Sequence, residues 1–465
     1  MTTATPTRIA DVDYPVDFEP SLVGRSLYAS RRLGKIDSAA VLTIMLCLLY
    51  LMPGRLIVPN LTYAGRPALL VALVLFCMWV LARLNPWLTM VGPQPLRWAV
   101  LAYFLALLGS YLAGLLRGLP SLEANAQNFG ILQVLEFIGV ILVTADGVPN
   151  WDRLKGVLRV LVWCAAFCAL VGIYESVAKV DIAHYYDFPG LELKGGFVGF
   201  ENRGVGFRVA GTATHYIEFS ACMAMAVPFA IHMARFAAKR WQRRAAIFCA
   251  LVCAAAVPIS ISRTGVLALV AGLLVMTAIW NWRLRYNILG GGVILIAALM
   301  VLRPGLLGTI SGMFTGAEED PSISGRTQDY ALVSHWFSER PWFGRGPWTL
   351  VPELYQGLVL DNQWLYTLVT GGLVGVAVLL GLHLTCITLA GIAMRRSKDA
   401  EIRHLCTALI AAQVICILVE GTVDSFYYTT FSITMALLMG MCGAVWRFTH
   451  PARRIRTATV RRFVK

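Results

Sequence analysis

The strongest constraint on the fold is a series of long apolar runs that recurs along most of the chain. A transmembrane helix needs about 20 consecutive apolar residues to cross the hydrocarbon core of a bilayer. The runs predict an all-α polytopic membrane protein with about 12 transmembrane helices. The predicted spans are residues 38–58, 67–84, 97–116, 128–145, 155–175, 211–234, 245–261, 264–282, 286–302, 371–394, 404–420 and 426–446.

Composition excludes a water-soluble or disordered protein. The 465 residues are 58% hydrophobic and only 14% charged, whereas about a quarter of an average soluble domain is charged. All eleven cysteines lie within apolar runs, without metal-ligand spacing. We therefore expect packing cysteines rather than ligands of a metal cofactor.

The net charge of +14 would suggest nucleic acid as a partner if the protein were soluble. Assigning the loops alternately places 28 of the 40 basic residues on the side of the N-terminus, together with only 9 of the 26 acidic ones. This bias is the positive-inside pattern. It predicts that both termini are cytoplasmic and that no nucleic acid is bound. The predicted parts are a disordered cytoplasmic tail (1–37), a transmembrane domain (38–446) and a basic cytoplasmic tail (447–465).

Two predicted outer loops are long, at residues 176–210 and 303–370, and both are rich in Trp, Tyr, Phe and Gly. Long loops are uncommon unless they are functional or disordered, and the aromatic content argues against disorder. We expect short helices on the outer membrane surface in both loops.

Arginine residues recur near the predicted outer boundary of the membrane domain. Arginine at a membrane boundary is costly unless it meets an anion, and its planar fork suits phosphate oxygens. The arginines are Arg208, Arg263, Arg326 and Arg345, and the other candidates are His215, Glu218 and Asp361. Such a set predicts a site for a polyprenyl-linked sugar diphosphate. Simpler roles stay open: Arg263 as an interface anchor, Arg345 paired with Glu339 or Glu353, Asp361 as a helix cap, and His215 bonded to Glu218.

The order of these segments resembles the bacterial O-antigen ligase/polymerase superfamily. An Arg and a following Gly precede a middle span (Arg208, Gly211), and a Ser-Arg pair opens a later turn (Ser262, Arg263). The long loop carries a glycine-rich stretch and then an "HN…L…G…G"-like signature, which here reads DNQWLYTLVTGGLVG. The matching residues there are Gly325, Arg326, Pro341, Gly344, Gly346, Asn362, Leu365, Gly372 and Gly375.

The resemblance implies a GT-C-like, multi-pass glycosyltransferase of the bacterial inner membrane that works without a metal. It implies a glycan donor on undecaprenyl diphosphate, a glycan or lipid-core acceptor, and inversion at the anomeric carbon. Membrane lipids and a chain-length regulator are the further partners. Arg208, Arg263, Arg326 and Arg345 would bind the diphosphate. A general base would assist the acceptor hydroxyl.

One position departs from the family pattern: Asp361 stands where the ligases have His. An Asp carboxyl ordinarily has a pKa near 4, which makes it a weaker base unless burial raises the value. His215, Glu218 or His335 are alternative bases. The departure favours a polysaccharide polymerase over a ligase acting on lipid A core. A lipid-linked oligosaccharide or solute transporter, or a scaffold, stays an alternative class.

Glu136 lies within a span, and Glu420 and Asp424 bracket the last outer turn.

Overall fold

The computed structural model describes residues 37–59, 61, 65–84, 93–186, 188–194, 202–203, 206–315, 321–355, 357 and 359–451. Within these ranges, the side chains of 183–184, 202–203, 206, 307, 313–314 and 321–329 are not described. The predicted tails at 1–36 and 452–465 therefore lie outside the described residues.

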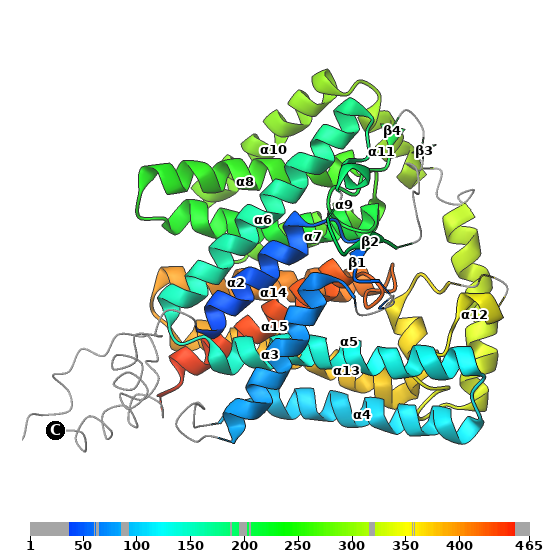
Figure 1. The fold of residues 1–465 in the computed structure, drawn as a ribbon. Helices are drawn as coiled ribbons and strands as arrows, with labels where there is room; N and C mark the ends of the chain where they lie inside the picture. The colour runs from blue at the N-terminus through cyan, green and yellow to red at the C-terminus, as the bar shows by residue number, and fades with distance from the viewer. Residues whose placement is uncertain are drawn as a thin grey trace, which may run out of the picture.

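The described chain is a helical bundle (Figure 1). Nine of its described helices are long and apolar enough to cross a membrane, and α2, α3 and α9 are shorter apolar helices. This confirms the predicted all-α polytopic fold. The twelve are α2 (Ser38–Leu51), α3 (Pro67–Arg83), α4 (Pro95–Arg117), α5 (Ser121–Gly147), α6 (Trp151–Ala178), α7 (Tyr216–Phe236), α8 (Arg240–Ile259), α9 (Arg263–Thr277), α10 (Trp282–Leu302), α13 (Gln363–Arg396), α14 (Ala400–Glu420) and α15 (Thr429–Thr449).

The helix ends differ from the predicted span ends where local chemistry overrides hydropathy. α2 ends at Leu51 because Pro53 follows it, although its apolar run continues to residue 58. α15 continues to Thr449, so Arg447 lies inside the bundle. Its guanidinium donates to the main-chain carbonyls of Asp146 and Val148, and this explains how a buried cation is tolerated there.

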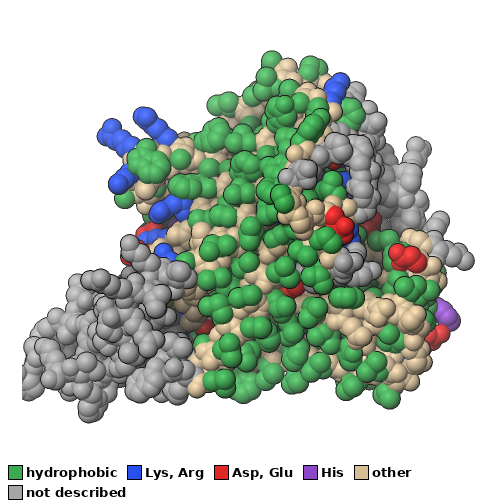
Figure 2. Space-filling model, in the orientation of Figure 1, with side chains coloured by type: hydrophobic (Ala, Val, Ile, Leu, Met, Phe, Trp, Pro, Cys, Tyr) green, Lys and Arg blue, Asp and Glu red, His purple; other side chains and the backbone are tan. Residues whose placement is uncertain are grey.

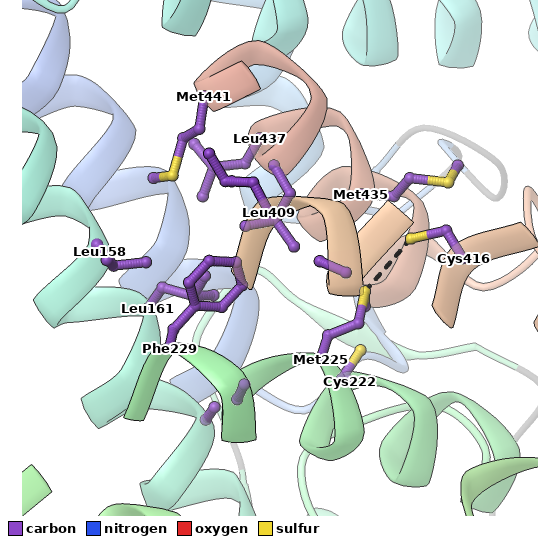
Figure 3. Packing of buried hydrophobic residues seen from close by; sticks show 14 of the residues in the cluster. Leu158, Leu161, Cys222, Met225, Phe229, Leu409, Cys416, Met435, Leu437 and Met441 are labelled. Atoms are coloured by element: carbon purple, nitrogen blue, oxygen red, sulfur yellow. Dashed lines mark hydrogen bonds between the residues drawn. The ribbon is translucent and has the colours of Figure 1, made fainter. Parts of the chain in front are cut away.

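The centre of the bundle is built from small and sulfur-containing side chains. Figure 3 shows Met225 and Cys222 of α7 facing Cys416 of α14, beside Met435 of α15. The Cys416 and Met225 sulfur atoms are 3.5 Å apart. All eleven cysteines are free and nine of them are buried, in agreement with a packing role. Figure 2 shows a largely hydrophobic flank with charged side chains toward its two ends, as expected of a bilayer-spanning surface.

Loops and short elements gather at one end of the bundle, on the right in Figure 1, which we call the loop-bearing end. The segment 303–362 forms α11 (Leu306–Thr315), α12 (Pro321–Glu339) and the 3-10 turn η3 (Pro352–Leu354), so the expected short helices are present. The segment 179–215 differs from the expectation. It forms the 3-10 turn η2 (Ile182–Tyr185) and pairs β2 (Glu192–Leu193) with β1 (Leu56–Ile57) and β3 (Asn202–Arg203) with β4 (Gly206–Phe207).

The helix α13 is broken at Gly372, where φ is +67° and ψ is −165°. The loop segment 341–346 fills the break with its own main chain. The N–H groups beyond the break donate to this segment, and the carbonyls before the break accept from it. The four bonds are Leu373 N to Pro341 O (2.8 Å), Val374 N to Trp342 O (3.2 Å), Arg345 N to Val369 O (2.9 Å) and Gly346 N to Thr370 O (3.0 Å). A broken membrane helix needs such replacement partners.

The fit of this segment depends on two glycines. A Cβ at Gly344 would lie 2.4 Å from the carbonyl carbon of Thr370, and one at Gly372 would lie 2.3 Å from the oxygen of Trp342. The glycines of the loop motif thus permit close main-chain approach. The break also turns the first part of α13 back over the bundle, since the rings of Trp364 and His383 lie 6.3 Å apart.

We predict that Gly372→Ala lowers the thermal stability of the purified protein, because a methyl group there meets Trp342 and L-residues avoid this backbone conformation. The expected cost is about 2 kcal/mol or more. Thermal unfolding in detergent, followed by tryptophan fluorescence, measures it. Gly381→Ala in the same helix is the matched control, because its Cβ would meet nothing within 4 Å. Equal midpoints for the two variants would contradict this account of the break.

Candidate active site at the loop-bearing end

Arg208 lies just before α7 and is only 8% exposed. Its guanidinium carbon sits 4.2 Å from the ring centre of Tyr216, and its Nη1 donates to the Tyr216 hydroxyl. Tyr216 is the first residue of α7. These contacts hold the cation against an aromatic ring.

His215 caps the N-terminus of α7. Its Nδ1 accepts from the main-chain N–H of Ile217 at 3.3 Å, so in the neutral ring Nε2 carries the proton. The ring lies 4.0 Å from that of Tyr216 and 5.2 Å from that of Tyr428, between centroids. Tyr428 precedes α15, so His215 links the starts of two helices at the loop-bearing end.

Glu218 is 1% exposed, and its carboxylate serves the main chain. One oxygen accepts from Thr214 N at 2.7 Å, and the other accepts from Thr430 N at 2.6 Å and Phe431 N at 3.3 Å. These bonds join the segment before α7 to the start of α15. Both oxygens are thus occupied by donors that a catalytic base would have to release.

Asp361 and Asn362 lie at the start of α13, and Asn362 is the residue that caps it. The Asn362 amide oxygen accepts from Leu365 N at 3.1 Å, and its amide nitrogen donates to Gly421 O at 3.0 Å. The helix start is thereby tied to the turn 421–428 between α14 and α15. Because Asn362 takes the capping position, the Asp361 carboxylate remains outside the helix.

Asp424 lies on this turn. Of the residues at this site, it is the one whose importance is least evident from the sequence. Burial raises the pKa of Asp424 to about 7, and the nearby Asp361 carboxylate adds to the rise, while the main-chain N–H groups of Tyr427 and Phe426 oppose it. A carboxyl group with a pKa near 7 is suited to proton transfer at neutral pH. An Asp isolated between two apolar spans was the only sequence signal, and its proximity to Asp361 is a property of the fold.

A cavity lined in part by Asp424 opens between α4, α13 and the turn 421–428. It encloses about 540 Å³, including its open mouth, and it has a largely apolar wall. The polar groups in the wall include Asp424, Gln363, Thr367, Thr370, Ser110 and Tyr103. Apolar walls with a few polar groups are typical of ligand sites.

The other three predicted arginines lie in different parts of the fold. Arg263 is the first residue of α9, whose Gly265 packs against Ser220 of α7, so it lies at the same end of the bundle as Arg208. Arg345 forms a separate network, in which it pairs with Glu339 at 3.4 Å and donates to the Tyr355 hydroxyl at 3.1 Å. The pairing with Glu339 is one of the simpler roles predicted for it. Arg326 lies in α12, and its side chain is outside the described residues.

Three other polar residues lie on α12, α13 and α5. His335 lies 3.4 Å from Glu339 on α12. His383 bridges α13 and α14, with Nδ1 3.0 Å from the Gln413 amide oxygen and Nε2 3.1 Å from Glu420. Glu136 is buried in α5, and neither of its carboxyl oxygens has a hydrogen-bond partner among the described residues.

Comparison with known proteins adds one match. Residues 245–380 match the family model described as O-antigen ligase. The matched region runs from α8 into α13 and contains Arg263, Arg326, Arg345 and Asp361, whereas Arg208, His215 and Glu218 precede it and Asp424 follows it. A search of curated proteins finds no match to this chain.

We expect Glu218→Gln to lower the thermal stability of the protein, because an amide NH₂ would replace an oxygen that accepts main-chain N–H groups. The expected loss is about 1–3 kcal/mol. Thermal unfolding in detergent measures it, with Glu192→Gln, an exposed residue of β2, as the matched control. An unchanged midpoint combined with a loss of activity would instead identify Glu218 as a catalytic group.

Proposed function

We propose that this chain, which belongs to the O-antigen ligase/polymerase superfamily, transfers a glycan from an undecaprenyl-diphosphate carrier to an acceptor hydroxyl at the loop-bearing end. At the family level it is a multi-pass membrane glycosyltransferase of the O-antigen ligase/polymerase kind. The finer proposal is a surface polysaccharide or O-antigen polymerase in the bacterial inner membrane, with both termini cytoplasmic and the loop-bearing end in the periplasm. The distribution of basic residues supports this orientation.

The observation that carries the proposal is Asp424, which lines a cavity and has the Asp361 carboxylate near it, at the end of the bundle that also holds Arg208 and Arg263. Cations suit the diphosphate of the carrier, and a partly protonated carboxylate pair suits proton removal from a hydroxyl. A transporter of the inverted-repeat kind keeps its polar residues near the membrane midplane. The charged groups of this site instead lie at one end.

In the proposed reaction, the acceptor oxygen attacks the anomeric carbon of the donor glycan from the face opposite the diphosphate. The bond from that carbon to the phosphate oxygen breaks, and its electron pair leaves with the lipid diphosphate. Asp424 takes the proton of the acceptor hydroxyl, and the neighbouring Asp361 charge keeps the pKa of Asp424 high enough for this role. Arg208 and Arg263 stabilise the charge that grows on the diphosphate, which is an electrostatic contribution.

We predict that Arg208→Ala and Arg263→Ala fold normally but lose glycan transfer by about 10²–10³-fold, the usual effect of removing one fixed electrostatic partner of a transition state. The test is the purified protein in vesicles with lipid-linked glycan extracted from the source organism. Growth of this donor alone into longer chains is expected of a polymerase, whereas transfer only to an added lipid A core acceptor would indicate a ligase.

Arg159→Ala is the matched control for these variants, because Arg159 is an exposed arginine in the first half of α6 and lies outside the proposed site. Full activity of both site variants would remove Arg208 and Arg263 from the mechanism. No transfer by the wild type with either acceptor would overturn the proposed function.

We expect the transfer rate to fall as the pH drops below about 7, because Asp424 must be deprotonated to accept a proton. Asp361→Asn removes the negative charge that helps to raise the pKa of Asp424, so its acid limb should move to lower pH. The other titratable groups close to Asp424 are the hydroxyls of Tyr366 and Tyr428. The measurement is the pH profile of kcat in vesicles.

Asp424→Asn should lose about 10²–10⁴-fold in rate across this pH range, as expected when a general base is removed. An acid limb that stays in place in Asp361→Asn, but moves in His215→Gln, would identify His215 as the base instead.

A further inference from the structure

Four aromatic side chains form a row at the loop-bearing end, in the order Tyr216, His215, Tyr428 and Tyr427. Neighbouring ring centroids are 4.0, 5.2 and 5.4 Å apart along this row. Arg208 lies over the first ring, at 4.2 Å. The last ring is the outermost, since Tyr427 is 60% exposed. We call these four side chains the ring row.

Tyr427 is held outward by a rigid turn. On one side of it, Phe426 packs edge-on against Phe137, with 5.1 Å between ring centroids, and its main-chain N–H donates to Gln363 at 3.1 Å. On the other side, Tyr428 belongs to the ring row and packs at 89° to the Tyr427 ring. The Tyr427 ring therefore stays exposed while the residues on both sides of it in the chain are anchored. A ring held in this way is preorganised for a ligand.

The surroundings of Tyr427 are polar. The Lys194 ammonium lies 5.8 Å from the centre of its ring. The main-chain N–H of Tyr427 donates to the Asp424 carboxylate, so the exposed ring and the proposed base sit on the same turn. An interfacial Tyr that only anchors a span lies among lipid headgroups. A ring that lies beside an ammonium group, on the same turn as a carboxylate, instead offers an apolar face with hydrogen-bonding groups nearby.

This combination matches the chemistry of a sugar ring. The C–H groups on one face of a pyranose carry slight positive charge and pack on the negative face of an aromatic ring, whereas its hydroxyls need polar partners at the edge. We propose that Tyr427 is the floor of a subsite for a pyranose ring of the acceptor glycan. This inference rests on the proposed function. The ring row then orders the reactants, with the diphosphate at Arg208, the base at Asp424 and the acceptor sugar on Tyr427.

The test uses the full chain in vesicles, lipid-linked glycan as donor, and as acceptor the same glycan released from its carrier by mild acid. Tyr427→Ala should raise the KM for this acceptor about 5- to 10-fold, as expected for one lost stacking contact, and leave kcat within about twofold. Tyr427→Phe keeps the ring and should behave like the wild type. Tyr185→Ala is the matched control, because Tyr185 is 72% exposed in η2.

A direct binding measurement separates this subsite from the reaction. Saturation-transfer NMR on the protein in nanodiscs should show contact with sugar C–H protons of the released glycan, and Tyr427→Ala should abolish it. If the Ala variant does not fold, Tyr427→Leu removes the ring while keeping apolar bulk.

Unchanged acceptor KM and unchanged saturation transfer in Tyr427→Ala would overturn the subsite and leave the proposed function standing. A fall in kcat without a change in KM would also overturn it, because that result means the side chain only positions Asp424. If the wild type binds the released glycan through Tyr427 but transfers nothing, the subsite stands and the proposed function fails.

Discussion

Four main-chain hydrogen bonds between the segment 341–346 and the break in α13 hold the loop-bearing end together. They replace bonds that α13 loses at Gly372, which a membrane protein cannot leave unmade at low cost. Because the break is stabilised in this way, the first part of α13 folds back and brings Asn362 against Gly421. That contact in turn brings Asp361 near Asp424. The site therefore depends on a loop whose own side chains contribute little to it.

The buried acids at this end divide into two kinds by what they bind. Glu175 accepts from the main-chain N–H groups of Gly211 (2.8 Å) and Ile182 (3.3 Å), and Glu218 accepts in the same way from two segments. These acids fix loops to helices. Asp424 differs in its surroundings, because it lines the cavity and lies close to a second carboxylate, that of Asp361. The acid that lines the cavity is therefore the one that we propose to move a proton.

Hydropathy predicted the spans well because the bilayer demands nearly the same length of apolar helix from every span. It failed at α13, which starts at Gln363 rather than near residue 371, because the loop segment 341–346 stabilises a helix that its own sequence would interrupt at Gly372. The pairing of β1 with β2 was equally hidden, since it joins segments far apart in the sequence. The arginines and Asp361 were identified from motifs. The sequence shows Asp424 only as an acid between two apolar spans, and its proximity to Asp361 depends on the fold.

The proposed mechanism offers a reason for Asp361 at the position where the O-antigen ligases that this chain resembles have His. A His is close to the right pKa for proton transfer at neutral pH without help, whereas an Asp ordinarily titrates near 3.9 and needs burial or a like charge to reach the same range. In this chain Asp361 supplies a like charge to the half-buried Asp424, so in the proposed mechanism the pair takes the role of a single imidazole. The proposed base then lies on the turn 421–428, which also carries Tyr427. In the proposed mechanism the proton acceptor and the exposed ring share this one short segment, so the distance between an acceptor sugar and its base is set within the turn.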